Sequence, residues 1–196
     1  MVTSANLRTV ISPLIGHLCW AVGHDPQFGL SLNFGRPVVR VLGEISARKA
    51  CNNRRRISVV DSTIGLRIFK GWSIALEDGS VVSARSRGPL IDAATKILKG
   101  QVLAYVAVTD KIGFTTFKFD LGARIEVMKP KSQREVVDLW ELYLPRDRGM
   151  TVLSNGEWRE GRLRDGETVS HPIRGIVEVG CCGVGNSFRV GDPEQG

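Results

Sequence analysis

The sequence is short of the residues from which metal and nucleophilic sites are built. Its 196 residues include three histidines and four cysteines, and no two cysteines form a C-x-x-C motif. This cysteine spacing is not that of a zinc site or a disulfide framework. Cys19 lies in an apolar run, which predicts a buried thiol. For the adjacent Cys181 and Cys182 two interpretations stay open, a redox-active pair and two reduced thiols in a flexible segment.

Long apolar runs are missing as well. No stretch of about 18 apolar residues occurs, so we predict no membrane-spanning helix. The first 23 residues resemble a signal peptide only faintly, because Pro13, Gly16 and His17 interrupt the run and no small-residue cleavage site follows. Together with cysteines that we interpret as reduced, this pattern predicts a cytoplasmic protein.

Repeats and a strong compositional bias are absent, whereas glycine is abundant. At 42% hydrophobic and 24% charged residues the chain has the composition of an ordinary globular domain. Its 22 glycines are about 11% of the chain, above the usual share of about 7%, and this excess favours a fold with many turns. No segment of 20 to 50 residues is repeated, so a solenoid or propeller is not predicted.

Strand-like alternation of apolar and polar side chains runs through most of the chain. We expect strands at 14–22, 30–34, 38–42, 56–69, 72–76, 101–109, 115–120, 136–144 and 150–153. Asp78-Gly79 and Asn155-Gly156 predict hairpin turns. Residues 101–109 are apolar on both faces, which predicts a central strand that is covered on both sides. We expect Trp20, Trp72 and Trp140 in the core and Trp158 at the surface.

One helix is predicted at 89–99. Pro89 suits the first turn and Gly100 suits the end. The apolar face consists of Leu90, Ala94, Ile97 and Leu98, and we expect it to cover one face of the strand that follows.

The predicted fold class is therefore mainly β (α+β), an antiparallel curled sheet, barrel-like or sandwich, with one packed helix at 89–99. Residues 1–13 are expected to form a flexible N-terminus and 14–162 a single β-rich domain. Residues 163–196 are rich in glycine and are expected to be a partly disordered appendage with at most one edge strand.

Several phrases resemble a known group of sequences. They are "CWAVGHDPQFGLSLNFGRPVVRV" (19–41), "GWSIALEDGSVVS" (71–83), "AATKILKGQVLAYVAV" (93–108) and "FKFDLGARIEV" (117–127), closed by "DLWELYL" (138–144). In this order they resemble a bacterial family of small β-rich proteins of unknown function, over residues 14–160. The resemblance implies a single β-rich domain with one helix. It implies no activity, cofactor or catalytic residue.

Positive charge is concentrated in one segment. The net charge is +7 and the pI is about 9.6. Residues 36–56 hold one acid, Glu44, and seven basic residues, which are Arg36, Arg40, Arg48, Lys49, Arg54, Arg55 and Arg56. We interpret 43–56 as a solvent-facing loop. Its Arg48, Lys49, Arg54, Arg55 and Arg56 are candidate contacts for an anion, an acidic protein or nucleic acid. No aromatic residue lies between Phe34 and Phe69, so bases have no stacking platform there.

Candidates for chemistry are few. His17, His24 and Asp25 lie close in sequence and are the one group that suggests a small-ligand or enzyme site. A strand would place the two histidines on opposite faces, so we predict no metal site, and no motif indicates a cofactor. Asp120 is interpreted as a turn residue.

Three function classes follow from these observations. The first is a non-catalytic bacterial protein-interaction module, immunity- or antitoxin-like. The second is a basic nucleic-acid-binding domain that acts through residues 36–56. The third is a small-ligand or enzyme barrel with a site near His17, His24 and Asp25. The sequence leans away from an enzyme, because it shows no converging set of catalytic groups.

Overall fold

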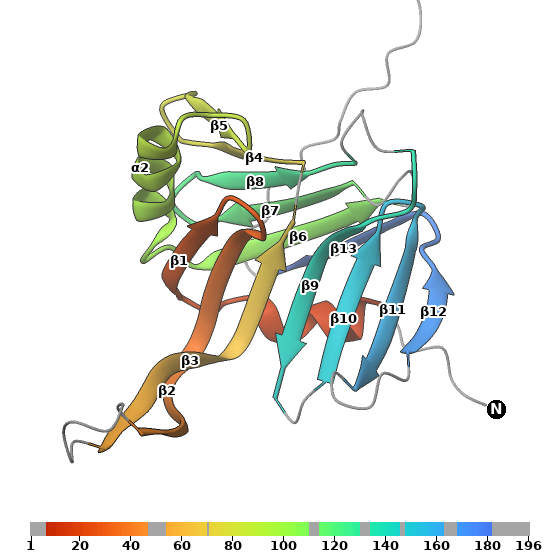
Figure 1. The fold of residues 1–196 in the computed structure, drawn as a ribbon. Helices are drawn as coiled ribbons and strands as arrows, with labels where there is room; N and C mark the ends of the chain where they lie inside the picture. The colour runs from red at the N-terminus through yellow and green to blue at the C-terminus, as the bar shows by residue number, and fades with distance from the viewer. Residues whose placement is uncertain are drawn as a thin grey trace, which may run out of the picture.

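The computed structural model describes residues 7–46, 54–69, 71–109, 114–129, 134–145, 148–162 and 168–181. It is mainly β, with two antiparallel sheets that face each other and short helices at the periphery (Figure 1). The predicted fold class is confirmed. Of the two alternatives it is the sandwich, because the sheets do not close into a barrel.

The larger sheet has seven strands in the order β1-β2-β3-β9-β10-β11-β12. Their bounds are β1 Cys19–Asp25, β2 Gly29–Ser46, β3 Arg54–Ile68, β9 Asp138–Leu144, β10 Arg148–Leu153, β11 Glu157–Arg162 and β12 Thr168–Pro172. The second sheet has six strands in the order β13-β6-β7-β8-β4-β5. Their bounds are β4 Trp72–Ala75, β5 Val81–Ser83, β6 Leu103–Thr109, β7 Thr115–Phe119, β8 Arg124–Val127 and β13 Ile176–Gly180.

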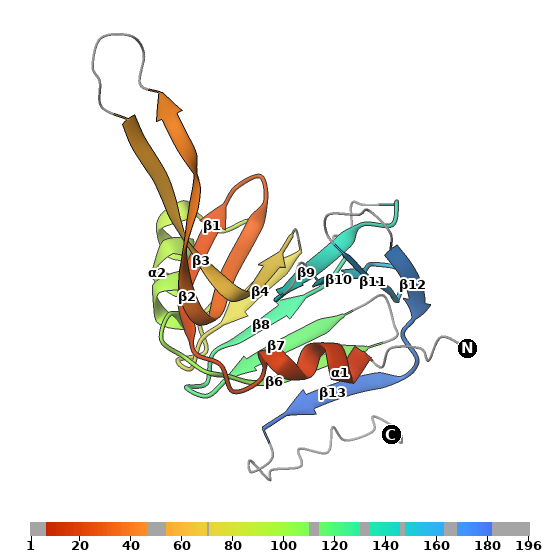
Figure 2. The same cartoon turned by 90° about the horizontal axis from the view of Figure 1, so that it is seen from below.

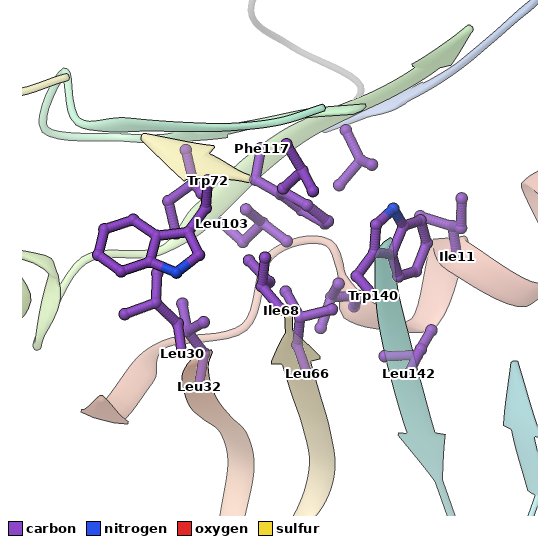
Figure 3. Close-up of a cluster of buried hydrophobic side chains, with 14 of the residues drawn as sticks. Ile11, Leu30, Leu32, Leu66, Ile68, Trp72, Leu103, Phe117, Trp140 and Leu142 are labelled. Atoms are coloured by element: carbon purple, nitrogen blue, oxygen red, sulfur yellow. The ribbon is translucent and has the colours of Figure 1, made fainter. Parts of the chain in front are cut away.

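The core lies between the two sheets, as Figure 3 shows. Phe117 on β7 meets Trp140 on β9 edge to face, with ring centres 5.4 Å apart. The Trp140 Nε1–H donates to Thr115 Oγ1 at 2.8 Å, so the polar atom of a fully buried indole is satisfied across the sheets. The predicted burial of Trp72 and Trp140 is confirmed, and Trp20 is half-buried.

Trp158 is a correction, because it is 2% exposed rather than at the surface. Its ring lies 4.8 Å from the ring of His171 on β12, the strand next to it in the sheet. β12, which brings His171 beside Trp158, was not among the predicted strands.

Both predicted hairpin turns are confirmed, and they share one geometry. The Gly79 N–H donates to the Leu76 carbonyl and the Gly156 N–H to the Leu153 carbonyl. The two glycines have φ of +81° and +80°, a conformation that other residues rarely adopt. Each turn therefore needs glycine at its last position, as in the common hairpin loop that ends in a glycine bulge.

The predicted helix is present as α2, Gly88–Leu98, and Gly100 follows it with φ +94°. Its orientation differs from the prediction. Leu90 and Ile97 are 54% and 50% exposed, while the buried residues are Ile91, Ala94, Thr95 and Leu98. The helix packs against β1 and β5 at one end of the sandwich rather than over a face of β6 (Figure 1).

The two ends of the described chain are more ordered than predicted. Residues 7–13, expected to be flexible, belong to helix α1, Leu7–Ile11, and the short 3₁₀ helix Ser12–Leu14. Helix α1 lies across an open end of the sandwich, and Ile11 sits beside Trp140 (Figures 2 and 3). The first strand begins at Cys19 instead of residue 14.

The segment expected to be an appendage contains two strands. β12 pairs with β11 at the edge of the larger sheet, and β13 pairs with β6 at the edge of the smaller one. The chain crosses between the sheets at residues 173–175, where Ile173 is buried. This segment therefore completes both sheets of the sandwich, while residues 182–196 lie outside the described part.

Candidate interaction site

A long two-stranded ribbon projects from the sandwich, as Figures 1 and 2 show. We call its residues 35–46 and 54–63 the β2–β3 arm. Glu44 pairs with Arg56 and Ser46 with Arg54, so the interpretation of 43–56 as a loop is wrong at both of its ends. Residues 47–53 lie outside the described part. The two short strands predicted at 30–34 and 38–42 are one strand, β2.

Gly35 and Pro37 bend β2 instead of ending it. Phe34 pairs with Ile64, and the next pair is Pro37 with Ser62. Strand β2 therefore has one extra residue here, which forms a β-bulge. Gly35 has φ +72°, and a Cβ there would lie 2.3 Å from the Thr63 Oγ1. The Arg36 N–H donates to the same hydroxyl at 3.1 Å. A glycine at 35 is therefore required for the arm to leave the sheet as it does.

No described strand pairs with either outer edge of the β2–β3 arm. β1 pairs with β2 only as far as Phe34, and β9 pairs with β3 only from Gly65 onward. In the β3–β9 register Pro145 falls opposite Thr63, and a proline has no N–H to continue the ladder. Such unpaired edges are sites where another strand can add.

Apolar side chains at the base of the arm face water. Val39 and Val60, which pair across the two strands, are 67% and 59% exposed, and Val38 is 44% exposed. Among the described side chains of the arm none belongs to the core. The arm therefore exposes apolar surface that the body of this protein does not cover.

A groove lies where β3 parts from β9, and we call it the root groove. Its volume is about 460 Å³. It is lined by residues of β2, of β3 and of the end of β9, which are Ser31, Leu32, Asn33, Val38, Asp61, Ser62, Thr63, Gly65, Leu66, Arg67, Tyr143, Leu144 and Pro145. The root groove and the open edge of β3 are continuous, because Thr63 belongs to both.

Several polar groups of the root groove have hydrogen-bond or cation–π partners. The Arg67 guanidinium lies 5.4 Å from the centre of the Tyr143 ring. The Tyr143 hydroxyl donates to the Glu141 carboxylate, and burial together with this carboxylate raises the pKa of Tyr143 to about 12. The Ser62 hydroxyl donates to Asn33 Oδ1 at 3.0 Å. A tyrosine held protonated suits recognition rather than proton transfer near neutral pH.

The described contacts of His17, His24 and Asp25 are separate from one another. The backbone carbonyl of His17 accepts from the Leu103 N–H, and the His24 ring packs edge to face on Trp72 at 5.7 Å. Asp25 Oδ1 accepts the backbone N–H groups of the two turn residues 27 and 28 at 2.7 and 3.2 Å. The contacts of His24 and Asp25 stabilise the packing against Trp72 and the turn after β1. In the described ranges, no three His, Cys, Asp or Glu residues are grouped so that they would hold a metal ion.

The remaining candidates have these positions. Arg48 and Lys49 lie outside the described residues, and Arg54, Arg55 and Arg56 begin β3, with side chains that the structure does not describe. Cys19 is fully buried, as predicted, and Cys181 is exposed, while Cys182 lies outside the described part. Asp120 Oδ1 accepts the Val102 N–H at 2.8 Å, which agrees with its interpretation as a turn residue.

Sequence reasoning missed the arm as a projecting element and missed the root groove. A signal for the arm is present, since β-branched residues are frequent on both sides of 43–56, in "PVVRVLGEI" and "RISVVDST". The groove has no such signal, because Arg67 and Tyr143 meet only through the pairing of β3 with β9.

Comparisons with known proteins found no match among family models, curated proteins or solved structures. In the residues that the structure describes, no helix has both the length and the apolar character needed to cross a membrane.

Proposed function

We propose that this chain is a non-catalytic interaction protein that binds another protein through the β2–β3 arm and the root groove. The observation that carries the proposal is the arm itself, a ribbon with open edges and exposed valines beyond the body of the sandwich. An isolated two-stranded hairpin is marginally stable in water. A partner strand or surface on the arm would bury Val38, Val39 and Val60 and satisfy the open edges.

The mode of action in this proposal is occupation of a partner's surface, as in an immunity or antitoxin protein. The root groove supports it, because its Tyr143 hydroxyl is held by the Glu141 carboxylate and its Ser62 hydroxyl by Asn33, which leaves no set of groups poised for proton transfer. A cytoplasmic location is part of the proposal, supported by the free thiols of Cys19 and Cys181.

Nucleic acid is the second candidate partner, favoured by the seven basic residues at 36–56. Binding of that kind would rest on phosphate contacts and would weaken steeply with salt. The exposed valines and the lack of aromatic residues between Phe34 and Phe69 favour a protein instead.

The test compares the full chain with an arm-shortened variant in which Asn-Gly replaces residues 38–61. These two residues suit a tight hairpin between the paired Pro37 and Ser62. Each protein is immobilised and exposed to extract from the native host, and stoichiometrically retained proteins are identified. We expect a protein that the full chain retains and the variant does not. Equal retention by both proteins, or retention of nucleic acid alone, would contradict the proposal.

A further inference from the structure

We infer that the partner segment is an extended acidic strand that adds to the open edge of β3 and begins in the root groove. This inference rests on the proposed function and specifies the chemistry of its partner. It names one edge of the arm, one direction of hydrogen bonding and one sign of charge, and each can be tested separately.

The hydrogen-bonding groups on that edge follow from the pairing of β3 with β9. The Phe69 N–H donates to the Leu139 carbonyl on β9, in the same register that pairs Gly65 with Tyr143. Because strand groups alternate with a period of two, the N–H groups of Thr63 and Val59 point to the same side. The described part of β9 does not reach them, so an added strand would occupy the place that β9 leaves.

The root groove gives the first residues of such a strand a defined binding position. It opens between Thr63 on the arm and Leu144 and Pro145 at the end of β9. Val38 adds an apolar wall, and the exposed Arg67 adds a positive charge that balances the Asp61 carboxylate in the same groove, so the positive charge offered to the strand is that of the arm. A volume of about 460 Å³ holds several side chains of an extended segment. The groove thus explains why addition would begin at this point of the edge.

Charge selects an acidic occupant. The arm holds five basic residues, Arg36, Arg40, Arg54, Arg55 and Arg56, and two acidic residues, Glu44 and Asp61, so it carries +3 of the net +7. A second copy of the arm would bring like charges together, which disfavours pairing between copies. An acidic strand would place opposite charges beside the arm, which strengthens binding and guides its approach.

The first test uses a short synthetic peptide of alternating glutamate and valine with the full-length protein. We expect binding that weakens with salt, and slower amide hydrogen exchange at Val59 and Thr63 by more than about tenfold. The amides of Ser58 and Val60 already face β2, so they should change little. A peptide in which lysine replaces glutamate should bind at least about tenfold more weakly.

The second test removes the hydrogen bonds and keeps the charges. Methylation of every second backbone nitrogen of the peptide should weaken binding by at least about tenfold, because the methylated strand cannot complete a ladder. On the protein, Val59→Pro removes one outward N–H, whereas Val59→Thr retains it as a matched control. We expect weak binding for Val59→Pro and near-normal binding for Val59→Thr, with the same circular dichroism for both.

The outcomes separate this inference from the proposed function. If the peptide leaves the Val59 and Thr63 amides unprotected, or if the lysine peptide binds equally well, the inference is wrong, even when arm shortening abolishes partner capture. If a DNA duplex binds the arm more tightly than the acidic peptide at equal salt, the inference is also wrong and nucleic acid is the partner. If arm shortening has no effect on capture, the proposed function fails.

Discussion

Cys19 shows what burial does to a single titratable side chain. Its thiol is fully buried, and burial raises its pKa from the ordinary 9.0 to about 12, although a backbone hydrogen bond from Asn33 lowers it somewhat. In the unfolded chain the same thiol ionises near its ordinary pKa. The folded state therefore holds the proton more tightly than the unfolded state. The contribution of this thiol to the free energy of unfolding is fully present below about pH 9 and is lost as the pH rises toward 12.

This asymmetry predicts a measurable alkaline weakening of the protein. Between pH 9 and pH 10.5 the free energy of unfolding should fall by up to about 1.4 kcal/mol per pH unit because of Cys19. Urea denaturation across this range should give a flatter pH dependence for Cys19→Ala than for the wild type. Cys181→Ala, which alters an exposed thiol, should leave the slope unchanged. Parallel curves for the wild type and Cys19→Ala would contradict the assignment.

Single residues were predictable where their burial depends on their own strand. Cys19 and Trp140 lie in apolar runs, and Trp72 alternates with the polar Ser73, so their burial follows from the sequence. Trp158 was not predictable in this way, because a strand more than ten residues later covers it. The root groove could not be predicted from the sequence for the same reason, because only the pairing of β3 with β9 brings Arg67 to Tyr143.

Elements were predictable where a local signal sets both ends. α2 has proline near its start and a left-handed glycine after its end, and its bounds were found to within a residue. Its apolar face was misassigned, because Leu90, Ile91, Ala94, Ile97 and Leu98 form an apolar arc wider than the surface it covers. β12, with the sequence TVSHP, has one large aliphatic residue, so its strand state depends on the edge of β11 that it joins. β13, with the sequence IVEVG, is mostly apolar and corresponds to the one edge strand that the sequence allows.

The role of these last strands can be measured with two matched isoleucines. Ile173 is 6% exposed where the chain crosses between the sheets, and Ile176 on β13 is 65% exposed. We expect Ile173→Ala to lower the free energy of unfolding by about 2–4 kcal/mol through lost burial and a residual cavity. Ile176→Ala should change it by less than about 0.5 kcal/mol. Equal small effects in denaturant titrations would show that the segment is an appendage after all.

At the scale of the whole molecule, the arm and the sandwich are energetically separable. The core is formed by the two sheets, α1 and α2, and the described side chains of the arm lie outside it. The arm supplies charge instead. Replacement of residues 38–61 by Asn-Gly removes six basic and two acidic residues, which lowers the net charge from +7 to +3.

The arm-shortened variant should therefore keep its fold and change its charge behaviour. We expect its thermal midpoint to stay within about 4 °C of the wild type, since less than about 1 kcal/mol is lost. It should also elute from a cation exchanger at lower salt than the wild type. A large drop in the midpoint would show that the arm stabilises the sandwich, and would require the interaction proposal to be tested with a milder truncation.

The contact between the two ends of the described chain has a consequence for biosynthesis. Helix α1 packs on β13, and the Arg8 Nε–H donates to the Glu178 carbonyl across 170 positions of sequence at 3.1 Å. Neither sheet has all its strands until residues 168–180 have left the ribosome, since β12 and β13 are the last described strands to be made. During synthesis the apolar inner faces of both sheets therefore stay partly exposed until the last strands are made. A chaperone that binds exposed apolar surface should raise the yield of native protein.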